Sequence, residues 1–215
     1  MNIKSAVGAA ILGLLLAVTG ASASQLPEDG QAKAAKAVFA PEFGKALPPI
    51  GFVQFCARQP ADCKPSGGKA DVLAMSPDRW NLLYQVNTYV NGKIAPVSDQ
   101  DLYGQPEYWA YPTDAGDCED YVLLKRRYLL GLGFPADALL ITVVLDEKHE
   151  GHAVLTVTTA QGDYILDNRR NEILRWSSID YTFLKRQSPL DPRVWVSLTK
   201  DRPVTNGYVA GRGAK

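Results

Sequence analysis

The sequence predicts an α+β domain in which helices come first along the chain and an antiparallel sheet follows. Two segments with helical spacing of apolar residues precede a group of β-branched, apolar stretches. These stretches are residues 139–145, 152–159 and 163–167. A short turn at Gln161 and Gly162 separates the last two, which indicates a hairpin. YTFLKRQ and RVWVSL follow as possible further strands, or a strand and a helix, before a glycine-rich tail.

The first helix is predicted from Ser76 to Val90. Ser76 is a suitable N-cap residue, and Pro77 suits the first helical position. Large side chains then recur at helical spacing, at Trp80, Leu83, Tyr84 and Val90.

The second helix is predicted to begin at Asp117, in the segment DCEDYVLLKRRYLLGLGFP. Asp117 is a candidate N-cap, acids fill the first turn and bases follow, which matches the helix dipole. Gly131, Gly133 and Pro135 end the pattern. Cys118 and several apolar residues share one stripe, so we expect a mostly buried helix with the cysteine in its first turn.

The N-terminus has the pattern of a secretory signal peptide over residues 1–23. A basic start at Lys4 precedes a short apolar run, and Ala21 and Ala23 form the A-x-A arrangement of a cleavage site. An uncleaved anchor is the alternative. We therefore expect a periplasmic or secreted protein without a stable membrane span, in which residues 24–50 form an extended arm and residues 51–215 form the domain.

Charge and cysteine content narrow the functional class further. The chain has 23 basic and 23 acidic residues and no basic stripe, which argues against nucleic acid as a partner. Cys56 and Cys63 lie close together in CARQPADC, a predicted loop that contains Pro60 and has no strand or helix pattern. Export favours a disulfide between them, with two free thiols as the alternative. Cys118 is then left over and needs an explanation.

Cys118 lies between acids in GDCEDY, and nearby negative charge raises a thiol pKa. A helix N-terminus has the opposite effect, and an imidazole commonly completes the activation of a thiol. His152 begins one hairpin strand and Asp167 ends the other, so their side chains can meet on one face. This spacing permits a cysteine–histidine–acid triad. The alternatives are a surface histidine and an aspartate that caps a turn.

A zinc site is a weaker interpretation of the same residues. HEGH, residues 149–152, is not H-E-x-x-H and is not part of a helical pattern. If the other two cysteines pair, one cysteine and two histidines remain, which is too few for a convincing site.

Several motifs in order resemble the bacterial transglutaminase-like cysteine proteinases. They are VNTYVNG, the Tyr108-Trp109 pair with Pro112, GDCEDY opening a helix with Lys125, GHAVL and YILDNR. This family includes the LapG-type periplasmic proteases, which cleave large biofilm adhesins. The resemblance implies a papain-like core with the nucleophile helix packed on an antiparallel sheet. It also implies Cys118 as nucleophile, His152 as base and then acid, and Asp167 as the orienting acid.

The resemblance further implies calcium binding by the acids beside the cysteine, here Asp117 and Glu119. Oxygen ligands suit calcium, and acids such as Asp99 and Asp101 would have to contribute. The alternative is a cap at Asp117 and a solvated acid at Glu119. The segment GQPEYWAYPTDAGDC departs from the usual family pattern, which leaves the substrate open.

We therefore expect an exported cysteine peptidase that cleaves a protein or peptide substrate, such as a surface adhesin. The Cys118 N–H would help to bind the oxyanion, and the Trp109 indole N–H is a candidate second donor, with core packing as its alternative. Transglutaminase or deamidase chemistry with the same triad stays open. So does a catalytically silent module that binds calcium or a peptide.

Overall fold

A computed structural model describes residues 38–65 and 73–200 of the 215-residue chain. The expected signal peptide, residues 1–23, and residues 24–37 of the expected arm lie outside this part. Within the described residues, no helix is both long enough and apolar enough to cross a membrane.

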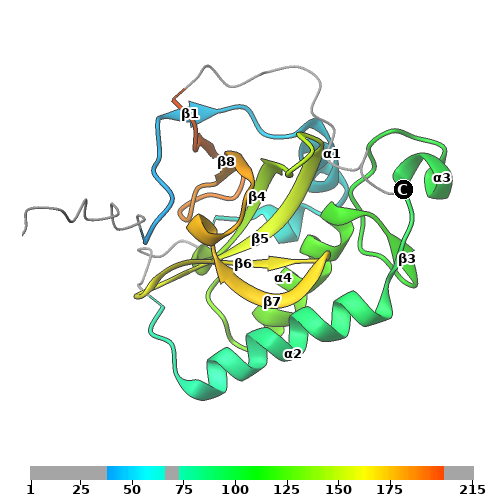
Figure 1. Ribbon diagram of the computed structural model, residues 1–215. Coiled ribbons are helices and arrows are strands. Elements are labelled where there is room, and N and C mark those ends of the chain that lie inside the picture. Colours follow the sequence, from blue (N-terminus) through cyan, green and yellow to red (C-terminus); the bar gives the residue numbers. More distant parts are fainter. Residues whose placement is uncertain (1–37, 66–72, 201–215) are drawn as a thin grey trace, which may run out of the picture. The chain divides into compact units, whose positions relative to one another are not determined.

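A seven-stranded sheet with the order β1-β9-β8-β4-β5-β6-β7 forms the centre of the fold (Figure 1). All of its neighbouring strands pair in antiparallel fashion. Its strands are β1 (Lys45–Ala46), β4 (Leu139–Leu145), β5 (Gly151–Thr159), β6 (Gly162–Asp167), β7 (Arg170–Arg175), β8 (Thr182–Gln187) and β9 (Trp195–Ser197). Two short parallel strands, β2 (Ala95–Pro96) and β3 (Ala115–Gly116), pair separately. The predicted antiparallel hairpin is β5–β6.

The described residues form four α-helices: α1 (Ile50–Arg58), α2 (Pro77–Lys93), α3 (Asp99–Tyr103) and α4 (Cys118–Gly131). The two helices predicted from the sequence are α2 and α4. Ser76 caps α2 as expected, because its side chain accepts a hydrogen bond from the Arg79 N–H at 3.2 Å. The α+β prediction is confirmed.

Helix α1 corrects the prediction that the first two cysteines lie in a loop. Cys56 belongs to this nine-residue helix, and Cys63 ends a 3₁₀ turn that follows it. Prolines flank the helix on both sides, and its length is too short to establish a clear period. Phe52 and Phe55 anchor it, since both are buried in the main core.

The core has two parts, one on each face of the sheet. On one face, α2 and α4 pack against side chains of β5 and β6 such as Leu155 and Leu166. On the other face, a smaller cluster gathers around Val154 and Ile165. Because β4 and β5 are covered on both faces, almost every residue of the two strands is buried, the polar ones of β5 included.

Residues 38–49, the described end of the expected arm, lie along the sheet. β1 pairs with β9, and the Ala40 N–H donates to Asp163 Oδ2 at 2.9 Å. The Asp163 N–H in turn donates to the Val38 carbonyl at 2.9 Å. These contacts secure the segment along the sheet.

Candidate active site

Cys118 is the first residue of α4, directly after the N-cap Asp117. It is the free cysteine of the described residues and is buried. Its Sγ donates a hydrogen bond to Glu119 Oε2 (3.1 Å) and accepts one from the Ala153 N–H (3.3 Å). Burial raises the pKa of the Cys118 thiol well above its usual range, and the charge of Asp117 raises it further. Burial and the charge of Asp117 therefore both favour the protonated form of the thiol.

His152 and Asp167 form a buried pair at the end of the β5–β6 hairpin. His152 Nε2 lies 2.9 Å from Asp167 Oδ1, and the two residues are 1% and 0% exposed. The strand register pairs Leu155 with Leu166, which places His152 and Asp167 diagonally on one face. The thiol contacts the backbone of Ala153, the residue after this histidine. The structure thus brings the three residues of the expected triad into one site.

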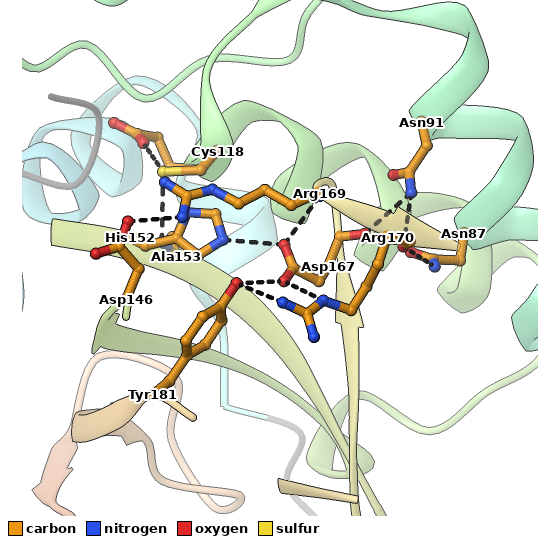
Figure 2. A network of polar contacts seen from close by, with 11 residues as sticks. Asn87, Asn91, Cys118, Asp146, His152, Ala153, Asp167, Arg169, Arg170 and Tyr181 are labelled. Carbon is orange, nitrogen blue, oxygen red and sulfur yellow. Dashed lines mark hydrogen bonds and ion pairs between the residues drawn. The ribbon is translucent and has the colours of Figure 1, made fainter. Parts of the chain in front are cut away.

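Asp167 has further partners that the sequence did not reveal (Figure 2). Its Oδ1 accepts the Arg169 N–H at 3.0 Å, while Oδ2 accepts the Tyr181 hydroxyl at 2.9 Å and lies 3.4 Å from Arg170 Nε. Burial alone would raise the pKa of Asp167. The hydrogen bond and charge of His152, with the Arg169 N–H and Tyr181 O–H, hold that pKa well below its usual range. Asp167 is therefore a firmly ionised hydrogen-bond acceptor.

The side chain of Arg169 reaches from the end of β6 past the His152–Asp167 pair toward β4. Its Nη1 lies 2.6 Å from Oδ2 of Asp146, the residue that follows β4. Because β5 lies between β4 and β6, this ion pair spans the end of β5 where His152 is located. Figure 2 shows the Arg169 side chain extending past His152 to Asp146. Tyr181 packs edge-on against the histidine ring, with 5.7 Å between ring centroids.

A group of acidic side chains lies on the other side of the thiol. One ligand oxygen each from Asp99, Asp117 and Glu119 lies within 4.8 Å of the others, and all three residues are buried. Burial raises the pKa of each of these carboxyl groups, to about 6 for Asp117. We call these three residues the acidic pocket. Asp101, the other loop acid considered, instead accepts a hydrogen bond from Ser98 at 2.7 Å on the surface.

Each carboxylate of the acidic pocket has one oxygen without a hydrogen-bond partner in the part of the chain that the structure describes. Asp99 Oδ1, Asp117 Oδ1 and Glu119 Oε1 are buried, and no hydrogen-bond partner for them exists in the described residues. Asp117 occupies the N-cap position but makes no side-chain capping bond, because its Oδ2 accepts the Asp99 N–H at 3.4 Å. Buried carboxylate oxygens without donors are costly, and a cation is the usual compensation. The donor set therefore fits a hard metal ion.

Two more acids border this pocket and bear on the Trp109 hypothesis. Burial raises the pKa of Glu107 and of Asp120 to about 8 each. The Trp109 indole N–H donates to Glu107 Oε1 at 2.6 Å, and the fully buried ring packs edge-on against Phe52. The indole N–H is thus already engaged, and its environment is that of a core residue. We therefore leave it out of the mechanism proposed below.

The disulfide prediction is confirmed. Cys56 and Cys63 are bonded to each other, with Cα atoms 5.6 Å apart. The bridge ties the end of α1 to the 3₁₀ turn after it, and Cys118 is left as a free thiol.

A buried thiol at a helix start, beside a histidine–aspartate pair on an antiparallel sheet, is the arrangement of papain-like cysteine hydrolases. The chain belongs to the bacterial transglutaminase-like cysteine proteinases (BTLCP), since the profile of that family matches residues 42–203. It is accordingly a transglutaminase-like cysteine peptidase, a hydrolase that acts on protein.

Solved structures of LapG from Legionella pneumophila are similar to the chain. One is 26% identical, covers 54% of this chain and 68% of LapG, and has a TM-score of 0.46. A calcium-bound LapG structure is 24% identical, with coverage of 63% and 78% and a TM-score of 0.49. An EGTA-treated one is 25% identical, with coverage of 60% and 72% and a TM-score of 0.48. No curated protein matches the chain in sequence.

Proposed function

We propose that this peptidase cleaves a peptide bond by nucleophilic attack of Cys118, with His152 as the proton carrier and Asp167 as its orienting acid. The contact that carries the proposal is the 2.9 Å approach of His152 Nε2 to Asp167 Oδ1. It leaves Nδ1 as the ring nitrogen available to the thiol. Only a histidine held in this way presents a fixed basic nitrogen to a neighbouring nucleophile.

The proposed reaction has two halves. The thiol transfers its proton to His152, and Sγ attacks the peptide carbonyl carbon. The oxyanion that forms is stabilised at the start of α4, where the Cys118 N–H has no acceptor within the helix. As the C–N bond breaks, His152 returns the proton to the leaving amine. Water then gives a proton to His152, attacks the thioester and releases the acid and the free thiol.

We propose further that Asp99, Asp117 and Glu119 bind a calcium ion. Three acidic side chains with buried, unpartnered oxygens support this, and an all-oxygen ligand set favours calcium over zinc. A bound divalent cation would offset the negative charge that raises the thiol pKa. The family resemblance had indicated Asp117 and Glu119, with acids such as Asp99 and Asp101 as contributors, and the burial of Asp99 beside the first two supports Asp99 over Asp101.

Export is also part of the proposal. The leader-like residues 1–23 and the disulfide between Cys56 and Cys63 both support an oxidising compartment outside the cytoplasm, the periplasm or the medium. We propose residues 24–50 as the arm and 51–215 as the peptidase domain of the exported chain. A large surface adhesin is the first substrate to test.

The test compares three variants of the exported protein. Cys118→Ala and His152→Ala should abolish both substrate cleavage and labelling by a thiol-directed acylating probe. His149→Ala is the matched control, because His149 is exposed in the β4–β5 loop, and it should retain both activities. Cleavage that persists in Cys118→Ala would refute the mechanism. Incorporation of a labelled amine, without cleavage, would identify a transglutaminase instead.

A further inference from the structure

Two asparagines of the VNTYVNG segment have no part in the chemistry above. Asn87 and Asn91 lie one turn apart on α2, so their side chains emerge on the same face of the helix. Asn87 is fully buried, although α2 has exposed positions for a polar residue. A buried amide is costly unless it is hydrogen-bonded. The hydrogen-bond partners of these two side chains therefore indicate the role of Asn87 and Asn91.

Together the two amides donate to the end of β6 and the beginning of β7, on either side of the turn that follows Asp167 (Figure 2). Asn91 Nδ2 lies 3.0 Å from the Asp167 carbonyl oxygen, 3.0 Å from that of Arg170 and 3.0 Å from Asn171 Oδ1. Asn87 Nδ2 lies 3.0 Å and 3.1 Å from the carbonyl oxygens of Arg170 and Asn171. We call Asn87 and Asn91 the amide clamp.

Beside the turn that the clamp contacts, the hydrogen-bond ladder between β6 and β7 is irregular. The β6–β7 register shifts between Ile165 and Asp167, so the regular ladder is interrupted just before the catalytic acid. Backbone carbonyls in such a region need other donors. The clamp provides them from α2, while His152 and Tyr181 bind the Asp167 side chain. Asp167 is therefore fixed through its backbone and its side chain at once.

We propose that Asn87 and Asn91 are positioning residues that set the location of Asp167, and through it the orientation of His152. The proposal rests on the proposed triad. Neither asparagine has a contact with Cys118 or His152 among the hydrogen bonds of the described residues, so their effect must pass through the Asp167 turn. Loss of a group that orients a metal-binding side chain commonly lowers activity about 10- to 100-fold, and we expect a similar loss of activity here.

The test is a double-mutant cycle between the clamp and the catalytic acid. Asn91→Ala in the otherwise native protein should lower kcat and the rate of Cys118 acylation by the probe about 10- to 100-fold. KM should change less than about twofold, because substrate contacts are kept. In an Asp167→Ala background, the same Asn91→Ala change should alter the acylation rate less than about twofold. Asn81→Ala, on the exposed side of α2, is the matched control and should have no effect.

Two further measurements separate positioning from a general structural role. Asn91→Asp keeps the shape of the side chain but removes its N–H donors, so it should reproduce the loss in Asn91→Ala, whereas a residue needed only to fill space would tolerate it. The downfield proton resonance of the His152–Asp167 hydrogen bond should be lost or shifted in both variants.

Equal losses from Asn91→Ala with and without Asp167 would overturn the amide clamp and leave the proposed triad intact. If Asp167→Ala alone left the acylation rate unchanged, the proposed triad itself would be refuted, and the clamp with it.

Discussion

The two sides of Cys118 differ in how they accommodate buried carboxylates. In the acidic pocket, Asp99, Asp117 and Glu119 each keep an oxygen that no described residue bonds. On the side of β5, both oxygens of Asp167 are bonded by side chains and backbone. Burial raises the pKa of the first group, whereas the partners of Asp167 lower its pKa.

This difference shows which buried carboxylates receive hydrogen bonds on both oxygens from the described residues. Asp167 is satisfied by the protein's own donors, so the histidine side is preorganised by the fold alone. In the acidic pocket one oxygen of each carboxylate has no donor among the described residues, and folding brings these carboxylates together against their mutual repulsion. We infer that the pocket requires a component from solution, and the following predictions test that asymmetry.

The largest effect is expected on the histidine side. Asp167→Asn removes the charge that orients His152 and stabilises its protonated form, so kcat should fall about 10³-fold or more. The thermal midpoint should change little in comparison, because the amide keeps the shape. Steady-state kinetics with separate kcat and KM values would measure this. A loss below about tenfold would contradict the assigned role of Asp167.

The next effect concerns the acidic pocket. Asp99→Asn removes one negative ligand, so calcium affinity measured by titration calorimetry should fall about 100-fold. Activity should then be lost at low calcium and recovered at high calcium. Asp101→Asn is the matched control, since Asp101 lies two residues away but faces solvent. An unchanged affinity in Asp99→Asn would exclude Asp99 from the site.

Stability of the calcium-free protein should fall as pH rises. The pKa of Asp117 is raised to about 6 and that of Asp120 to about 8, both by burial. Groups with a raised folded pKa contribute stability below their unfolded pKa, near 4, and lose it as pH rises through the folded value. The thermal midpoint in chelator should therefore fall by roughly 5 °C between pH 5 and pH 8.

Calcium should abolish most of this pH dependence, because the cation stabilises the charged carboxylates. The measurement is a pair of pH series, one with excess calcium and one with chelator. Parallel curves would contradict the asymmetry between the two sides, since the pocket would then need no cation.

The smallest effect is expected at the Arg169–Asp146 ion pair, where the pH dependence has the opposite sign. Hydrogen bonds from Arg169 and from backbone N–H groups overcome the effect of burial and lower the pKa of Asp146. The stability that this pair contributes is present above the unfolded carboxyl pKa and is lost as pH falls below it. Because Arg169 is partly exposed, Arg169→Ala should cost about 1 kcal/mol at pH 7.

The difference between the native protein and Arg169→Ala should shrink toward zero at pH 3, as followed by thermal unfolding. Arg193→Ala breaks a more exposed pair with Asp191 and should cost less at every pH. A cost for Arg169→Ala that grows at low pH would show that the ion pair is not its source.

Much of the fold and of the proposed triad was predictable from local patterns. Ser76 and Asp117 marked the beginnings of two helices, and the short turn after Thr159 fixed the hairpin register. That register is sufficient to bring His152 and Asp167 together, since their positions relative to the turn determine which side chains are diagonal neighbours.

Other parts of the site had no local signal. Tyr181 stood in a strand-like segment with nothing to indicate that its hydroxyl meets Asp167. Trp109 could be proposed as an oxyanion donor only until the fold placed Glu107 against its indole nitrogen. Asp99 and Asp101 were indistinguishable as candidate ligands in the sequence, and the fold distinguishes them because the start of α3 buries Asp99 and exposes Asp101.

The sequence by itself determined the order of the elements and the candidate nucleophile, base and acid, because capping, period and register depend on residues close together in the chain. Only the tertiary structure decided which carboxylates have partners. The donors to Asp167 and to the start of β7 include residues 14 to 83 positions away from their acceptors, such as Tyr181, Asn91 and Asn87. Among the described residues, no donor reaches the free oxygens of the acidic pocket. Hydrogen bonding and desolvation depend on that three-dimensional neighbourhood, and together they set the charge of each buried acid.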